Sequence, residues 1–143
     1  MGDLFISIGS TCNACAETDP ESASLLRAKL DQNRRTVFAG GLRNTIGFDW
    51  HPETNALWGM DIGADWLGAD IPPEELNNLT GGGNFGWPWC YGNRQTDPNM
   101  DPPPGGQSAE AYCAQTQPAV LTHQAHSSPG WAERISAWFA SAA

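Results

Sequence analysis

The sequence predicts an all-β chain, and three observations support this fold class. Short segments that alternate apolar and polar residues recur at even spacing along the 143 residues. The 16 glycines and 11 prolines interrupt the chain too often for long helices. Tryptophan occurs 7 times, and such large rings usually fill cores or form stacking surfaces. Together these features favour a β-propeller or a β-sandwich.

The first half of the chain contains one strand and two hairpins. Residues 4–10, LFISIGS, alternate and end in a Gly-Ser turn, so they are predicted as a strand. Residues 22–33, SASLLRAKLDQN, have an apolar spacing that would suit a short helix, but the polar turn at 31–33 and the RTVFAGG that follows favour a hairpin. The clearest hairpin spans residues 45–63, with its turn at Pro52–Asn55.

The second half is richer in loops. Residues 72–79, PPEELNNL, are predicted as a short polar-edged segment. Residues 81–92, GGGNFGWPWCYG, combine glycine with aromatic residues, a pattern that indicates a place where the backbone passes close to another group. Residues 92–118 form a long loop, a length that is uncommon unless the loop is functional or cross-linked. A last strand is predicted within residues 119–126.

The C-terminal residues differ in character from the rest. Trp131, Ile135, Trp138 and Phe139 would fall on one face of a short helix. The same residues could instead be a non-native end, produced by truncation or by a shifted reading frame. The sequence leaves both interpretations open.

The composition excludes some classes of partner. The formal charge of −9, from 16 acidic and 7 basic side chains, repels nucleic acid and anionic membrane surfaces but not a calcium ion or a neutral substrate. No apolar run approaches the length of a membrane span, so no membrane insertion is expected. The N-terminus lacks the basic-then-apolar pattern of a signal peptide and begins as a strand, which indicates an internal part of a larger protein.

The four cysteines form two local pairs. Cys12 and Cys15 make a CxxC, and Cys90 and Cys113 flank the long loop. A zinc site would require the two pairs to meet, although they are far apart in sequence. Two disulfides are favoured and indicate an oxidising compartment, with free buried thiols as the second interpretation.

An acidic cluster is the first candidate for site chemistry. Oxygen ligands on a glycine-bent loop suit Ca²⁺, although the spacing here is not that of an EF-hand. From the residues alone, a solvated acidic loop is favoured over a calcium site. The members of the cluster are Asp61, Asp65, Asp70, Glu74 and Glu75, with Gly63 and Gly68 between them.

The histidines give weaker signals. His123 and His126 form an HxxH on a strand-like segment, where this spacing directs the side chains to opposite faces and makes a poor chelate. A structural role or one solitary functional histidine is favoured there. His51 precedes Pro52 in a turn and is interpreted as a turn residue.

The pair Arg43–Asn44 in GGLRNTIGFDWHP would by default be a loop arginine beside a nearby carboxylate. The order of the surrounding motifs is more specific, since GLRN, GFDWHPET, LWGMDIGADWLGAD, PPEELN and GGNFGWPWCYG follow one another. This order resembles the glucose/sorbosone dehydrogenase family over about residues Gly2–Ser128. The segment GDLFISIGSTCNACAETDP is similar to the L-sorbosone dehydrogenase branch, which has a CxxC after its Gly-Ser turn.

The resemblance implies a fold, because members of this family are soluble, pyrroloquinoline-quinone-dependent aldose dehydrogenases built as six-bladed β-propellers. A blade takes roughly 40 to 45 residues. Residues 1–128 would therefore form a partial propeller of about three blades at most, and residues 129–143 a divergent tail. Open blade edges in such a partial ring would favour self-association.

The resemblance also implies contacts with the quinone and with calcium. A guanidinium can pair with the quinone's carboxylates in a fork and an amide can donate to its carbonyls, so Arg43 and Asn44 are expected to bind the cofactor. The family holds one Ca²⁺ against the cofactor with main-chain carbonyls, and a second, structural Ca²⁺ elsewhere. The matching positions are Gly63 and Ala64 for the first ion, and Glu75 and Phe85 for the second. As a departure, Ile62 stands where the family usually has a polar residue beside the first ion.

The activity implied by the resemblance is oxidation of an aldose or aldehyde to a lactone or acid, with a separate electron acceptor. The family's catalytic base is a histidine upstream of the LFISIGS strand, so no catalytic residue is assigned and this chain alone is expected to be inactive. The alternative is a non-catalytic, calcium-stabilised propeller-type binding module. The family is periplasmic or secreted, which agrees with the expected disulfides.

Overall fold

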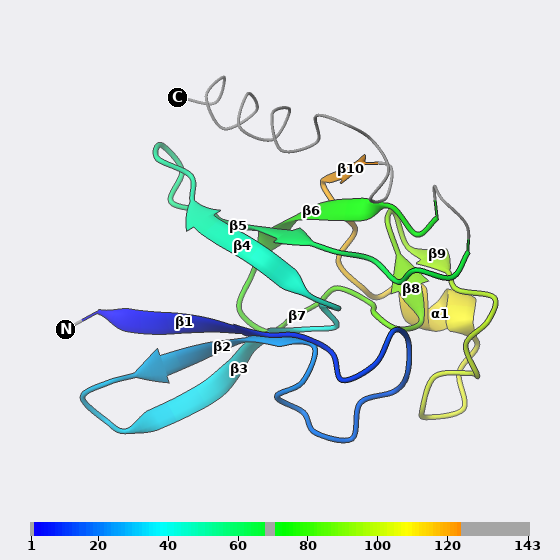
Figure 1. Ribbon diagram of the computed structural model, residues 1–143, viewed down its shortest axis with the longest axis horizontal. Coiled ribbons are helices and arrows are strands. Elements are labelled where there is room, and N and C mark those ends of the chain that lie inside the picture. Colours follow the sequence, from blue (N-terminus) through cyan, green and yellow to red (C-terminus); the bar gives the residue numbers. More distant parts are fainter. Residues whose placement is uncertain (1, 68–70, 124–143) are drawn as a thin grey trace.

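The computed structural model describes residues 2–67 and 71–123, and nearly all of its regular structure is β-strand. Two four-stranded sheets, with strand orders β1-β2-β3-β7 and β10-β6-β5-β4, are accompanied by the two-stranded sheet β8-β9 (Figure 1). The predictions for Asp70, His126 and the tail 129–143 lie outside the described residues. The elements are β1 (Asp3–Ile8), β2 (Ser24–Lys29), β3 (Arg34–Gly40), β4 (Thr45–Trp50), β5 (Leu57–Asp61), β6 (Glu74–Leu79), β7 (Gly83–Asn84), β8 (Cys90–Tyr91), β9 (Gln95–Thr96), α1 (Ala109–Cys113) and β10 (Leu121–His123).

The first sheet contains the predicted strand and the first hairpin. β1 pairs antiparallel with β2, and β2 with β3, so the helical alternative for this segment is wrong. The turn between β2 and β3 includes Asn33, whose φ of 45° is a left-handed conformation that asparagine tolerates. β7 joins the sheet from a distant part of the chain and pairs parallel with β3, with Ala39 opposite Gly83.

The second sheet contains the second predicted hairpin, β4–β5. His51 stabilises its turn, because His51 Nδ1 accepts hydrogen bonds from the backbone N–H groups of Glu53 at 3.3 Å and Thr54 at 3.4 Å. This confirms the interpretation of His51 as a turn residue. β6 continues the sheet, and β10 confirms the predicted last strand as far as His123.

β6 differs from the polar-edged segment that the sequence predicted. Glu74, Glu75, Leu76 and Asn77 are all buried, although three of these side chains are polar. β6 is an inner strand between β5 and β10, so both of its backbone edges are paired. Buried polar groups need hydrogen-bond or ionic partners, so this strand forms part of an internal polar site.

The hydrophobic core contains residues from both four-stranded sheets. Phe5 on β1 contacts Phe38 on β3 and Trp50 on β4 edge-on, with ring centroids 5.0 Å and 5.4 Å apart, so aromatic contacts link the two sheets. Figure 1 shows these sheets one above the other, with β8, β9 and α1 to one side. The buried core cluster is Leu25, Ala39, Leu42, Leu57, Leu79 and Phe85.

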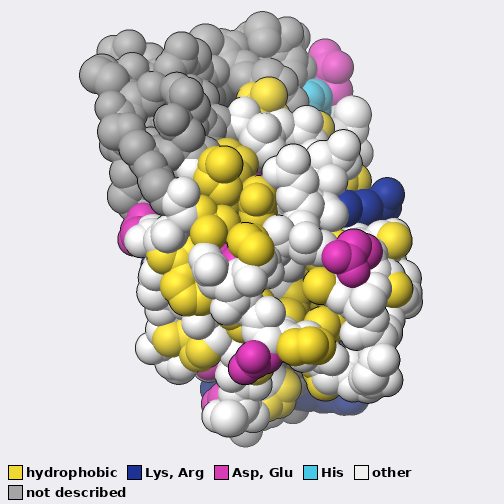
Figure 2. Space-filling view, turned by 90° about the vertical axis from the view of Figure 1, so that its right-hand side faces the viewer, with side chains coloured by type: hydrophobic (Ala, Val, Ile, Leu, Met, Phe, Trp, Pro, Cys, Tyr) yellow, Lys and Arg dark blue, Asp and Glu magenta, His cyan; other side chains and the backbone are white. Residues whose placement is uncertain are grey.

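Large hydrophobic side chains are also exposed. Figure 2 shows hydrophobic side chains gathered, with acidic groups between them, on the face that carries β8, β9 and α1. Such patches suit contact with further protein, because burial of apolar area contributes about 25 cal/mol per Å². The exposed large hydrophobic residues are Leu4, Leu30, Val37, Ile46, Trp50, Trp66, Ile71, Val120 and Leu121.

Among the described residues no helix has the length and apolar character needed to span a membrane.

All four cysteines are in disulfides, so the zinc and free-thiol alternatives are wrong. Cys12 pairs with Cys15, and Cys90 pairs with Cys113 across the long loop. That loop is more ordered than predicted, because it contains the strand β9, which pairs with β8 just before the loop, and the helix α1. Ser108 caps α1 by accepting a hydrogen bond from the backbone N–H of Ala111 at 3.2 Å.

Candidate cofactor and calcium site

The GGLRN turn connects β3 to β4 and places Arg43 and Asn44 at the site. Gly41 has φ +69°, and a Cβ there would meet Asn84 Oδ1 and come within 2.7 Å of the Gly86 nitrogen. Only glycine suits this combination of left-handed backbone and close approach. The next residue, Leu42, is buried in the core, which fixes the direction in which the turn leaves the sheet.

Asp61, at the end of β5, holds this turn in place. Its carboxylate accepts hydrogen bonds from the backbone N–H groups of Arg43 at 2.8 Å and Asn44 at 2.9 Å, and from Thr45 Oγ1 at 3.0 Å. Burial raises the pKa of Asp61 to about 7, and these hydrogen bonds and the Arg43 charge partly oppose the rise. Asp61 is therefore a structural anchor of the turn as well as a buried acidic group.

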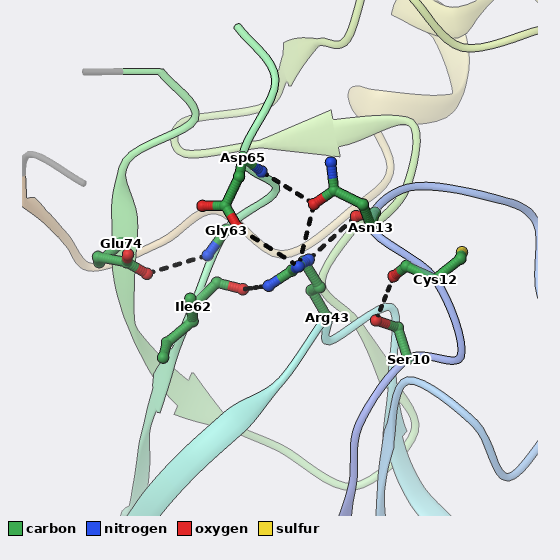
Figure 3. Close-up of polar contacts among 8 residues, drawn as sticks. All are labelled: Ser10, Cys12, Asn13, Arg43, Ile62, Gly63, Asp65 and Glu74. Atoms are coloured by element: carbon green, nitrogen blue, oxygen red, sulfur yellow. Dashed lines mark hydrogen bonds and ion pairs between the residues drawn. The ribbon is translucent and has the colours of Figure 1, made fainter. Parts of the chain in front are cut away.

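The Arg43 guanidinium lies among oxygen atoms from two loops (Figure 3). Nε donates to the backbone oxygen of Asn13 at 3.0 Å, one terminal nitrogen to Asn13 Oδ1 at 3.0 Å, and the other to the Ile62 oxygen at 3.4 Å. The ion pair with the exposed Asp65 is long, at 3.9 Å. A guanidinium has five N–H donors, so two remain for a ligand when hydrogen bonds to the described residues are counted.

Asn44 is placed differently from Arg43. Its side chain lies against Gly9, because a Cβ at Gly9 would be 3.1 Å from Asn44 Oδ1. Its backbone oxygen accepts a hydrogen bond from the Ile62 nitrogen at 3.1 Å. Arg43 and Asn44 are thus both tied to the segment that follows β5.

Glu75 on β6 is the second buried carboxyl. Its Oε1 accepts from the Gly92 nitrogen at 2.5 Å and its Oε2 from Asn77 Nδ2 at 3.2 Å. Burial first, and then the nearby Asp61 charge, raise the pKa of Glu75 to about 8. Because Asp61, Glu74 and Glu75 are all buried, the favoured interpretation of a solvated acidic loop is wrong for these residues.

The four residues predicted to hold calcium surround one small cavity of about 20 Å³. Gly63, Ala64, Glu75 and Phe85 all line it. Roughly 10 to 15 Å³ is enough for one water-sized sphere, so the cavity has room for a single small species. The sequence assigned these residues to two separate ions, whereas the structure brings them together around one space.

The groups around this cavity fit a hard cation. Its wall also includes Arg43, Asp61 and Asp97, the last of which is 5 % exposed. Asp97 accepts a hydrogen bond from Trp66 Nε1 at 2.9 Å. Buried carboxylates are costly unless they are paired or coordinate a metal, and carboxylate with main-chain oxygen is the ligand set that Ca²⁺ prefers. The donor chemistry of this chain is therefore compatible with calcium.

Sequence reasoning did not identify Asn13 or Asp97. Asn13 lies inside the CxxC, and its only sequence signal is that position. Asp97 lies in the long loop, where Asp-Pro-Asn indicates a turn and nothing more. Cys12 and Cys15 lie near Glu17, but both sulfurs are in a disulfide and cannot act as thiolate ligands.

Solved structures of similar shape include a calcium structure of Trichoderma reesei Carbohydrate-Active Enzymes Family AA12, with a TM-score of 0.68 and 23% identity over 87% of this chain and 40% of that chain. A crystal structure of glucose dehydrogenase has a TM-score of 0.60 and 24% sequence identity, over 90% of this chain and 38% of that chain. The apo form of the soluble aldose sugar dehydrogenase of Escherichia coli has a TM-score of 0.58 and 20% sequence identity, over 92% of this chain and 42% of that chain. These similarities confirm the predicted all-β, partial-propeller fold.

Sequence comparison gives the family. An uncharacterized protein of Borreliella burgdorferi is 38% identical over 93 residues, which are 64% of this chain and 24% of that protein. This chain thus spans about a quarter of that relative and about 40% of the similar structure from Trichoderma reesei. The model of the Glucose / Sorbosone dehydrogenase family matches residues 5–132. Because this match covers most of the sequence, the chain belongs to the glucose/sorbosone dehydrogenase family.

Proposed function

We propose that this chain supplies the quinone-binding turn and the calcium site of a pyrroloquinoline-quinone-dependent dehydrogenase of the sorbosone branch. The complete protein would oxidise an aldose or aldehyde to a lactone or acid and pass the electrons to a separate acceptor. The observation that carries the proposal is that the GGLRN turn contributes Arg43 to the wall of the cavity that Asp61 and Glu75 also line.

Each group in this arrangement has a definite task in the proposed site. Arg43 has free N–H donors and a positive charge, so it would bind an anionic oxygen of the quinone. Asp61 orients the turn through the backbone of Arg43 and Asn44. Glu75, with main-chain oxygens of Gly63 and Phe85, would hold Ca²⁺. When bound, the quinone would supply the two-electron acceptor and the calcium would act as a Lewis acid.

The proposed location is the periplasm or the cell exterior. The two disulfides support it, because disulfides persist in oxidising compartments. The metal part of the proposal is supported by the similarity in shape to the calcium structure from Trichoderma reesei.

The second candidate function is a calcium-stabilised binding module without a quinone. It is favoured by the three hydrogen bonds that Arg43 already makes to the protein, which give this side chain a structural role of its own. Both candidates include calcium, so only quinone binding distinguishes them.

A quinone titration of the full-length protein tests the proposal. If Arg43 binds a quinone carboxylate, Arg43→Ala should weaken affinity by on the order of 1.5 to 3 kcal/mol, the value of a charge-assisted hydrogen bond. Arg43→Lys should recover only part of this, because an ammonium cannot replace the planar fork. Tryptophan fluorescence would report binding, and a melting curve of each variant would report folding.

A matched control is Arg34→Ala, at the exposed start of β3. This variant should bind quinone like the wild type. Equal quinone affinity in the wild type, Arg43→Ala and Arg43→Lys would refute the cofactor assignment and leave the binding module.

A further inference from the structure

The loop between β1 and β2 is built around the Cys12–Cys15 disulfide, which closes a ring of few residues. Further hydrogen bonds fix the loop from within. Ser10 Oγ donates to the Cys12 oxygen at 2.7 Å, and the Thr11 nitrogen and hydroxyl donate to the Glu17 carboxylate at 2.6 Å and 2.7 Å. The Ser10 nitrogen also donates to the Arg43 backbone oxygen at 2.7 Å, so this loop is attached directly to the GGLRN turn.

Asn13, the first residue between the two cysteines, is the point where three segments meet (Figure 3). Its backbone oxygen and its Oδ1 each accept a hydrogen bond from the Arg43 guanidinium at 3.0 Å. The same Oδ1 accepts from the Asp65 nitrogen at 2.9 Å. One amide oxygen therefore links Arg43 to the segment that carries Gly63 and Ala64.

The chemistry of these acceptors matters for an arginine that must bind an anion. A free arginine side chain loses rotamer entropy when it is fixed, so prior orientation strengthens binding. A carboxylate could orient Arg43 but would also cancel its charge. Asn13 offers two neutral oxygens, whereas the ion pair of Arg43 with the exposed Asp65 is long, at 3.9 Å. The guanidinium is thus oriented while its positive charge stays available.

We propose that Asn13 is a positioning residue that orients Arg43 toward the anionic part of the quinone, and that the Cys12–Cys15 disulfide fixes Asn13 for this task. The inference rests on the proposed function, since it assumes that Arg43 binds the quinone. Asn13 itself does not touch the reacting atoms. Its contribution is made through Arg43 and through the position of the segment Ile62–Asp65.

Three variants of the full-length protein test this role, each measured by quinone titration and by a melting curve. Asn13→Ala removes the side-chain acceptor and should weaken quinone binding about tenfold, the effect of one lost charge-assisted hydrogen bond. Cys12→Ala/Cys15→Ala releases the loop and should weaken binding to a similar degree. Asn13→Asp keeps the oxygen acceptor but adds a negative charge, so it should leave the melting temperature near that of the wild type and still weaken binding. If Asn13 had only a structural role, Asn13→Asp would not weaken quinone binding while leaving the melting temperature unchanged.

The matched control is Asn99→Ala, an exposed loop asparagine whose side chain makes no hydrogen bond within residues 2–67 and 71–123. It should bind quinone like the wild type. If Arg43→Ala weakens binding while Asn13→Ala does not, the positioning role is refuted and the proposed function stands. If the wild type and Arg43→Ala bind equally, the proposed function has failed.

A double-mutant cycle of Asn13→Ala and Arg43→Ala, measured as stability without quinone, tests the positioning role independently of the proposed function. The stability lost on Asn13→Ala should be smaller when Arg43 is already alanine, because the two side chains are bonded to each other. Additive losses would overturn the positioning role whether or not quinone binds.

Discussion

Replacing Glu75 by glutamine should change how the stability of this protein depends on pH and on calcium. Glu75 is buried on β6, and burial together with the Asp61 charge raises its pKa from 4.5 to about 8. In the absence of a divalent cation, the folded protein therefore keeps a proton on Glu75 that the unfolded chain has lost. Since the folded pKa is the higher one, this contribution to stability is complete below about pH 4.5 and is lost as the pH rises through about 8.

The size of the effect follows from the same pKa. Stability should fall by about 1.4 kcal/mol for each pH unit between the two values, or up to about 4 kcal/mol from pH 5 to pH 8. A typical domain has about 5 to 15 kcal/mol in total, so the loss is large. Asp61, with a folded pKa of about 7, contributes in the same direction over a narrower range.

Glu75→Gln removes this ionisation while keeping the shape of the side chain. The new amide oxygen can still accept from the Gly92 nitrogen. Its NH₂ group would face Asn77, whose buried Oδ1 has no hydrogen-bond partner in the part of the chain that the structure describes. Rotation of the Asn77 amide would let that oxygen accept the new donor. The variant should therefore be more stable than the wild type at pH 8 without calcium, and its stability should depend less on pH.

The assay is urea unfolding at several values between pH 5 and pH 8, with a chelator or with excess Ca²⁺. A cation at about 100 times its dissociation constant should stabilise the wild type by about 2.7 kcal/mol and the variant much less. Glu53→Gln, in an exposed turn, is the control and should behave like the wild type. Equal stabilisation of Glu75→Gln and the wild type by calcium would refute the metal role of Glu75, and a wild-type stability that does not fall between pH 5 and pH 8 without calcium would refute its raised pKa.

Two further predictions concern folding. Cys90→Ala/Cys113→Ala should destabilise the protein by about 3 kcal/mol, because the disulfide closes a sequence separation of 23 residues; chemical unfolding measures this, and an unchanged midpoint would contradict it. Gly41→Ala should cost on the order of 1 to 3 kcal/mol through its left-handed backbone and its clash with neighbouring atoms. Gly47→Ala has no atom within 4 Å of the added carbon and should cost nothing, so equal melting temperatures for these two glycine variants would count against the turn geometry described here.

Local patterns in the sequence predicted the hairpins and the disulfides. The β4–β5 hairpin was predictable because strand-forming residues flank a turn that contains Pro52, all within a short stretch. The apolar spacing of residues 22–33 would also suit a helix, but the polar turn that follows β2 correctly predicted the β2–β3 hairpin. Both cysteine pairs were predicted because each pair is close in sequence.

The parts that could not be predicted depend on contacts between distant residues. The sequence EELNN in β6 is polar, and nothing within it shows that Glu75 and Asn77 are buried in the fold. The hydrogen bonds of Asn13 to Arg43 join residues 30 positions apart. The resemblance to the family identified Arg43 and Glu75 as site residues, but it gave no reason to expect Asn13 or the burial of Asp61.

The parallel pairing of β7 with β3 has a consequence for the order of folding during synthesis. The first sheet receives its fourth strand only when residues 83–84 have emerged from the ribosome, and β4, β5 and β6 of the second sheet emerge before them. The Gly82 and Phe85 nitrogens then donate to the Phe38 and Gly40 oxygens at 2.7 Å and 2.9 Å and close that edge. Until β7 pairs with it, β3 is an unpaired edge strand of the first sheet, and such an edge can pair wrongly with other strands.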